Sequence, residues 1–121
     1  MSSARSLEAP AYAAGDCACF RHPDFDGRIR LESVQNAHDQ AVIAASAISG
    51  KPTPYDAVPW FWSDQYDVKL QIAGLAVPGA DVVVRGDPAE GRSLSVLYLE
   101  DGRLTAVDAA NSPRDFVQGR R

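Results

Sequence analysis

The sequence has little of what secreted, membrane-spanning or nucleic-acid-binding proteins need. Its two cysteines, Cys17 and Cys19, are too few and too close to stabilise a small secreted fold. No apolar run approaches the roughly 20 residues of a membrane span, and the first ten residues lack the apolar stretch of a signal peptide. Lys and Arg number 12 against 16 Asp and Glu, which gives a net charge of −4 and disfavours phosphate binding. These absences predict a cytoplasmic protein that binds neither nucleic acid nor a membrane.

Common catalytic and nucleotide-binding motifs are missing as well. The sequence contains neither GxGxxG nor GxxxxGK(S/T), and it has no HExxH zinc motif. Cys17 and Cys19 are spaced as CxC, which is not the CxxC of redox proteins, and His22 and His38 do not complete a known zinc pattern. The pair could supply half of a metal site, but two small, half-buried residues after a strand are the favoured interpretation.

One helix stands out in the 121 residues. Apolar side chains recur at helical spacing between residues 34 and 48, mostly as alanine. Ser33 or Asn36 can cap its beginning, and Gly50 stands where a helix commonly ends. A stripe of small residues predicts that a sheet or a second helix packs closely against it. Before this helix, residues 9–14 are expected to form a short strand that enters a glycine turn.

The second half of the chain predicts a small antiparallel sheet. Three prolines in residues 51–59 mark a linker, and apolar residues alternate over 68–72, 94–98 and 104–108. Asp101-Gly102 is a strong hairpin signal, and Asn111-Ser112-Pro113 is typical of a helix start. The C-terminal helix is expected to be too short to bury a useful apolar stripe. The predicted fold class is therefore α+β.

Two segments resemble flavoprotein reductases. APAYAAGDC at residues 9–17 is similar to the Gly-Asp segment that closes the FAD site of pyridine-nucleotide-dependent reductases. RLESVQNAHDQ at 30–40 and VPWFWSDQY at 58–66 resemble NAD(P)H-dependent ferredoxin reductases of the putidaredoxin reductase and rhodocoxin reductase type. The resemblance implies FAD as cofactor, NAD(P)H as co-substrate and a [2Fe-2S] ferredoxin as partner, often serving an oxygenase.

The resemblance also implies four cofactor-binding residues. Gly15 lets the backbone approach a ligand, and the Asp16 carboxylate accepts hydrogen bonds from a ribityl hydroxyl. The backbone N–H of Val34 points at a flavin carbonyl oxygen, and Trp62 lies beside the isoalloxazine ring. Trp60 and Phe61 are expected to anchor the sheet instead. Glu32 could face the nicotinamide or simply be a solvated carboxylate, and His38 is expected at the surface.

Family members are about three times longer and contain two glycine-rich nucleotide-binding turns that this sequence lacks. Residues 1–50 are therefore expected to be the end of an FAD-binding domain, and residues 60–121 an incomplete C-terminal domain. The chain is expected to be a fragment that is inactive alone, with no catalytic residue or metal of its own. The alternatives are a stand-alone interaction module, self-associating through its exposed flavin-side surface, and a truncated gene product without function.

Overall fold

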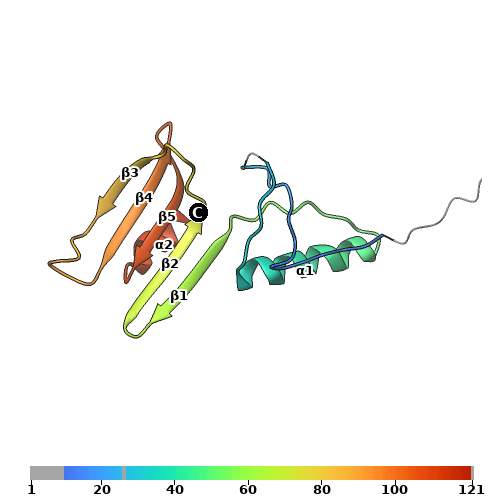
Figure 1. Ribbon diagram of the computed structural model, residues 1–121, viewed down its shortest axis with the longest axis horizontal. Helices are drawn as coiled ribbons and strands as arrows, with labels where there is room; N and C mark the ends of the chain where they lie inside the picture. The colour runs from blue at the N-terminus through green and yellow to red at the C-terminus, as the bar shows by residue number, and fades with distance from the viewer. Residues whose placement is uncertain (1–9, 26, 121) are drawn as a thin grey trace, which may run out of the picture.

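The computed structural model describes residues 10–25 and 27–120 in two parts. The first part contains one long helix, α1 (Val34–Ile48), and the irregular segments around it. The second part is a five-stranded sheet with a short helix, α2 (Pro113–Gly119). Figure 1 shows that the start of β1 lies near the N-terminal end of α1, where the two parts meet. Among the described residues, neither helix is long and apolar enough to cross a membrane.

The sheet is antiparallel throughout, in the order β1-β2-β5-β4-β3. Its strands are β1 (Trp60–Gln65), β2 (Val68–Gly74), β3 (Asp81–Arg85), β4 (Leu94–Glu100) and β5 (Arg103–Ala110). The predicted hairpin joins β4 to β5, where Asp101 and Gly102 have φ of 50° and 77°. Both values lie in the left-handed region that a tight two-residue turn requires. The predicted sheet is confirmed, and β1 is an additional strand formed by the tryptophan cluster.

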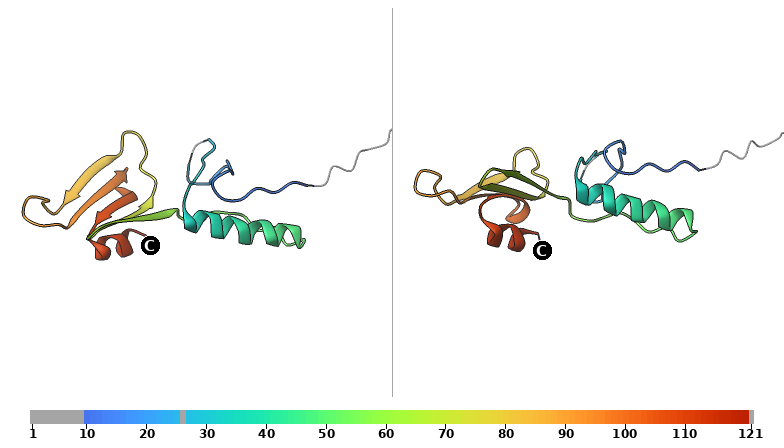
Figure 2. Two further views of the ribbon diagram at one scale, coloured as in Figure 1. Left: turned by 60° about the horizontal axis from the view of Figure 1, so that its bottom comes forward. Right: turned by 90° about the horizontal axis from the view of Figure 1, so that it is seen from below.

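The core lies between one face of the sheet and α2. Ala73 on β2 and Val107 and Ala109 on β5 are each 1% exposed, and Phe116 of α2 packs on them together with the partly buried Trp60 and Leu97. Figure 2 shows α2 lying under this face of the sheet. As expected, the short C-terminal helix buries no apolar stripe, but its single buried side chain, Phe116, completes the core. One aromatic side chain in two turns suffices, because the small side chains of the sheet leave room for it.

The other face of the sheet is not covered by an element of the described chain (Figure 2). Successive strand residues point to opposite faces, so the neighbours of the core residues lie on this open face. They include Phe61, Leu70, Ile72 and Val96. The apolar residues whose alternation predicted the strands are mainly these. The sheet therefore has one face with a compact core of small residues and one open apolar face.

α1 begins and ends as its sequence predicts, but it packs in the opposite way. The Ser33 hydroxyl accepts a hydrogen bond from Asn36 N–H, and Gly50 follows the helix with φ of 77°. The apolar stripe faces outward: Val34, Val42 and Ile48 are 67%, 55% and 68% exposed. The buried residues of α1 are polar: Gln35, Asn36 and Gln40. Within residues 10–25 and 27–120, neither a sheet nor a second helix packs against the alanine stripe.

The predicted strand before α1 is also not found. Ala9 lies outside the described residues, and residues 10–14 form no strand. A strand needs a hydrogen-bonding neighbour, and the five strands of the described chain all belong to the sheet of residues 60–110. The Gly-Asp turn itself is present, with Gly15 at φ of 81° and Ala18 N–H bonded to Gly15 O at 2.9 Å.

Asp115 connects α2 to the sheet and makes the fold sensitive to acid. Hydrogen bonds from Ser95 (2.5 Å) and Ser112 (3.0 Å), with the Arg85 guanidinium at 2.8 Å, hold the pKa of Asp115 below its usual value. A carboxyl whose pKa is lower in the folded chain stabilises it above the unfolded pKa, and this stability disappears as pH falls through the folded value.

We therefore expect Asp115→Asn to lower the free energy of unfolding at neutral pH and to flatten its pH dependence below about pH 4. Urea unfolding of both proteins across this range measures the effect. The two curves should converge as the pH falls. Curves that stay parallel down to the most acid conditions would contradict this role of Asp115.

Candidate functional site

The N-terminal part is organised by three buried side-chain amides of α1: Gln35, Asn36 and Gln40, here called the amide face. Asn36 is fully buried, and its Nδ2 donates to Leu31 O at 2.9 Å. The Tyr55 hydroxyl donates to Asn36 Oδ1 at 3.0 Å, which ties the segment after α1 to the beginning of the helix. A buried amide is stable only when its polar atoms are bonded, so these contacts fix the path of both segments.

The other two amides hold the turn before α1 and the strand after it. Gln40 Oε1 accepts the N–H of Gly15 at 2.8 Å, so the Gly-Asp turn lies against α1. Gln35 Oε1 accepts the N–H of Trp60 at 3.2 Å, so β1 starts beside the first turn of the helix. Three segments far apart in sequence therefore meet around the N-terminal half of α1.

Three of the predicted site residues lie at this meeting point. Gly15 is buried with positive φ, and a Cβ there would lie 3.5 Å from Ala37 Cβ, while Asp16 beside it is exposed. Val34 is the first residue of α1. Ala37 lies one helical turn further on, about 4.5 Å along the axis, so the Gly-Asp turn is within about one turn of Val34.

The backbone N–H of Val34 is available to a ligand. The first four N–H groups of a helix have no acceptor within it. The Ser33 hydroxyl accepts one of them, Asn36 N–H, and the helical series of bonds starts with Ala37 N–H donating to the Ser33 carbonyl. In the part of the chain that the structure describes, the N–H of Val34 makes no such bond. The partial positive charge at this end of α1 also favours an electronegative group.

Trp62 lies on β1, two residues beyond the hydrogen bond that joins Trp60 to Gln35, or about 7 Å along the strand. It is 36% exposed and stacks on Trp60, with ring centroids 5.4 Å apart and planes at 29°. Trp60 in turn contacts Phe116 edge-on, and the guanidinium of Arg120 lies 4.6 Å from its ring centroid. Trp60 is thus an anchor of the sheet, as expected, and its packing holds Trp62 in place.

Phe61 behaves differently from its expected role. It is 41% exposed and lies on the open face of the sheet, away from the core under α2. The expectation that it anchors the sheet is wrong, because alternation along β1 places it opposite its two tryptophan neighbours. Phe61 and Trp62 are therefore adjacent aromatic residues of similar exposure on opposite faces.

Charged and titratable groups near the site are mostly solvated. The Glu32 side chain is 57% exposed and pairs with Arg30 at 2.9 Å, so it is a surface ion pair in this chain. His38 is exposed as expected, and its hydrogen bond, followed by that of Gln35, keeps the pKa of Asp39 low. Burial raises the pKa of Tyr55, which stays protonated and able to donate to Asn36.

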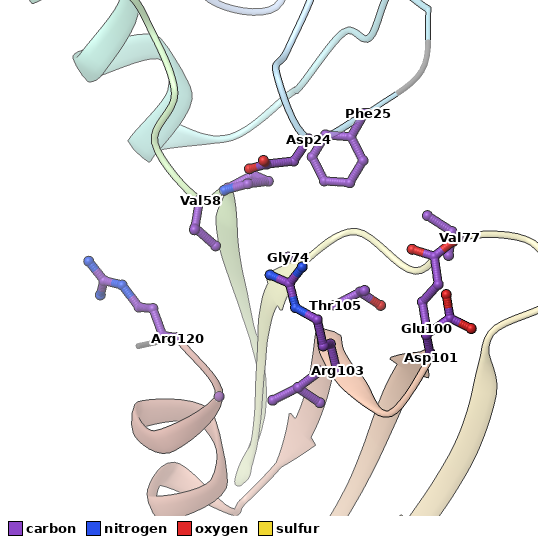
Figure 3. Close-up of a pocket in the computed structure, with 13 residues that line it drawn as sticks. Asp24, Phe25, Val58, Gly74, Val77, Glu100, Asp101, Arg103, Thr105 and Arg120 are labelled. Carbon is purple, nitrogen blue, oxygen red and sulfur yellow. The ribbon is translucent and has the colours of Figure 1, made fainter.

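Two hollows lie near the junction of the two described parts. The larger, about 460 Å³, lies between the Asp24–Phe25 segment and the end of the sheet where β2 ends and β5 begins, and Arg103 and Arg120 contribute to its lining (Figure 3). It is not lined by any of the four predicted site residues. The smaller, about 240 Å³, is lined by Glu32 and Ser33 on one side and by Trp60 and Phe61 on the other. None of the four predicted site residues lines it either, although Ser33 and Phe61 are chain neighbours of Val34 and Trp62.

Cys17 and Cys19 are both exposed free cysteines. The favoured interpretation of half-buried residues after a strand is wrong, because both side chains are exposed and residues 10–16 form no strand. Among residues 10–25 and 27–120, no group of three His, Cys, Asp or Glu side chains could hold a metal ion.

The amide face was not found from the sequence. A glutamine or asparagine in a helix is usually a surface residue, and the alanine stripe indicated the wrong side of α1. The available signal is that Asn36 and Gln40 are four residues apart and so share one side of the helix.

Residues 60–121 match the family model described as "Reductase C-terminal". Over 110 residues the chain is 57% identical to the 5,5'-dehydrodivanillate O-demethylase ferredoxin reductase subunit of a Sphingobium species, covering 90% of this chain and 26% of the relative. The ferredoxin reductase for the CYP199A2 system of Rhodopseudomonas palustris is 49% identical, with a TM-score of 0.79 over 88% of this chain and 26% of that one.

A covalent complex of putidaredoxin reductase with putidaredoxin contains a third similar structure. The matched chain of this complex is 44% identical to this chain with a TM-score of 0.78, and the match covers 88% of this chain and 25% of the matched chain. The chain thus spans about a quarter of the length of the relatives it matches. These matches confirm the predicted resemblance and fold class.

Proposed function

The chain belongs to the reductase C-terminal family, and from this membership we propose that it forms part of a flavoprotein oxidoreductase. The complete enzyme would pass electrons from NAD(P)H through FAD to a [2Fe-2S] ferredoxin. The observation that carries the proposal is the meeting of the Gly-Asp turn and the start of β1 at the N-terminal end of α1, held by Gln40 and Gln35. Residues 1–50 would complete the FAD-binding domain, and residues 60–121 would form the C-terminal domain, joined by 51–59.

The residues at this end of α1 fit a flat, polar-edged cofactor. Gly15 presents backbone without a side chain, and the exposed Asp16 carboxylate can accept hydrogen bonds from ribityl hydroxyls. The N–H of Val34 can donate to a carbonyl oxygen of the ring, where the helix dipole favours negative charge. Trp62 offers a rigid, partly exposed indole for the ring edge.

When bound, FAD supplies the conversion between two-electron and one-electron transfer, and the protein supplies position and electrostatics. In this chain Asp16 and Val34 would orient the cofactor from one side. The Trp60–Trp62 stack would limit the access of water to the edge of the flavin ring, because Trp60 holds Trp62 against the sheet.

Exchanging the matching segment of putidaredoxin reductase for this chain tests the proposal. We expect the chimaera to retain FAD and to reduce putidaredoxin with NADH, whereas the host without the segment should do neither. Loss of flavin in a folded chimaera would contradict the proposed site. A chimaera that retains flavin but does not reduce putidaredoxin would contradict only the proposed electron delivery to a ferredoxin.

A second candidate is a self-associating interaction module, which the exposed stripe of α1 favours. In that case the isolated chain would associate through α1, and Ile48→Lys would abolish the association through this helix. Sedimentation velocity of the isolated chain and this variant distinguishes the two candidates.

A further inference from the structure

β3 (Asp81–Arg85) is an unprotected edge of the sheet. All five of its residues are exposed, including Val82, Val83 and Val84 at 56%, 47% and 59%. It pairs with β4 on one side, and in the described part of the chain no strand pairs with the other. Edge strands of soluble proteins are commonly protected by a charge, a proline or a bulge within the strand. β3 has three consecutive β-branched valines instead, with charges at its two ends.

The charges at the two ends of β3 are complementary to each other. Its sequence is Asp-Val-Val-Val-Arg, with the negative residue first and the positive residue last. When two copies of such a strand pair antiparallel about a twofold axis at Val83, Asp81 lies opposite Arg85 of the other copy at both ends. Val82 then lies opposite Val84. A register shifted by two residues loses both charge pairs, so the charges select this register.

The geometry around the strand allows this pairing. Asp81 and Arg85 are four residues apart and lie on the same face of the sheet, the face that α2 covers. Arg85 contacts Asp115 at 2.8 Å and remains 58% exposed, so its guanidinium has donors left for a second carboxylate. Figure 1 shows β3 at the end of the described chain remote from α1, so none of the described segments blocks the approach of a second copy to this edge.

We propose that the partner of β3 is a second copy of this chain, which pairs edge to edge to form one continuous ten-stranded antiparallel sheet. The interface is isologous, because the same strand contributes from both copies. It contains two Asp81–Arg85 pairs, three valine pairs and the backbone hydrogen bonds of a new strand pair. This surface differs from the site at α1, so the proposal stands independently of flavin binding.

Charge reversal tests the pairing through a mixing experiment on the full chain. Asp81→Arg and Arg85→Asp each turn both attractive pairs of the dimer into repulsive ones. We expect each variant alone to raise the dimer dissociation constant about tenfold or more in sedimentation equilibrium. An equimolar mixture of the two variants restores both charge pairs, and we expect it to form a heterodimer about as tight as the original dimer.

Two further variants keep the test decisive. Arg85→Asp also removes the contact with Asp115, so thermal unfolding must show that this variant remains folded. If it does not fold, Val83→Lys is used as the disrupting variant, because the two lysines of a dimer would face each other at the twofold axis. Ile48→Lys on α1 is the control and should leave the dimer intact. A wild-type chain that stays monomeric over the whole dilution series would overturn the proposal. Dimers that ignore the charge reversals would overturn it as well.

Discussion

Replacing Gly74 by alanine should unfold the sheet, whereas the same change at Gly79 should be mild. Gly74 ends β2 with φ of 74°, and its N–H donates to Pro59 O at 2.8 Å. A Cβ at Gly74 would lie 2.0 Å from Thr105 O and 3.0 Å from Ala106 Cα. Both are backbone atoms of β5, a central strand, so neither can move without breaking the ladder with β2 or β4.

We expect Gly74→Ala to lower the free energy of unfolding by about 4 kcal/mol or more, because backbone strain and a backbone clash act together. Gly79 has φ of 87° but no atom within 4 Å of the added Cβ. Its replacement should therefore cost only the backbone strain, about 1–2 kcal/mol. Urea unfolding followed by tryptophan fluorescence compares the two variants. Equal losses at both positions would show that the clash at β5 does not exist.

Replacing Asp16 by alanine in the putidaredoxin reductase chimaera should weaken flavin binding strongly. Hydrogen bonds to a charged group contribute about 1.5–3 kcal/mol each, so loss of the carboxylate should raise the FAD dissociation constant about 10- to 100-fold. Asp56→Ala is the matched control, since Asp56 is also exposed but lies in the segment between the two parts of the chain.

Equilibrium dialysis of the deflavinated chimaera against FAD measures both constants. The control should bind FAD as the unmodified chimaera does. If Asp16→Ala and Asp56→Ala bound FAD equally well, the Asp16 carboxylate would have no place in the flavin site.

Local chemistry explains why much of the fold is predictable from the sequence. The Asp101-Gly102 turn, the Ser33 cap and the Pro113 helix start depend on neighbouring residues alone, and the structure contains all three. The strand before Gly15 and the packing of α1 depend on partners distant in sequence. Gln40 bonds to a residue 25 positions away, which no local pattern of hydrophobicity can indicate.

The candidate site divides in the same way. Gly15, Asp16, Val34 and Trp62 were predicted from motifs, because a cofactor site imposes specific residues at specific spacings. Their flavin contacts remain a prediction. The amide face that brings their segments together was missed, since Gln35, Asn36 and Gln40 gain their importance only from tertiary contacts. Phe61 illustrates the limit further, because it was predicted to anchor the sheet together with Trp60, while alternation along β1 turns the two side chains to opposite faces.

The central claim is that Gly15–Asp16, the first residue of α1 and Trp62 contact one flavin. The fluorescence lifetime of bound FAD in the chimaera tests it most directly, because an indole next to a flavin quenches the excited ring by electron transfer. We expect Trp62→Leu to lengthen the lifetime markedly and Phe61→Leu, at the adjacent residue on the opposite face, to leave it unchanged. An unchanged lifetime in Trp62→Leu, with FAD fully bound, would contradict the claim.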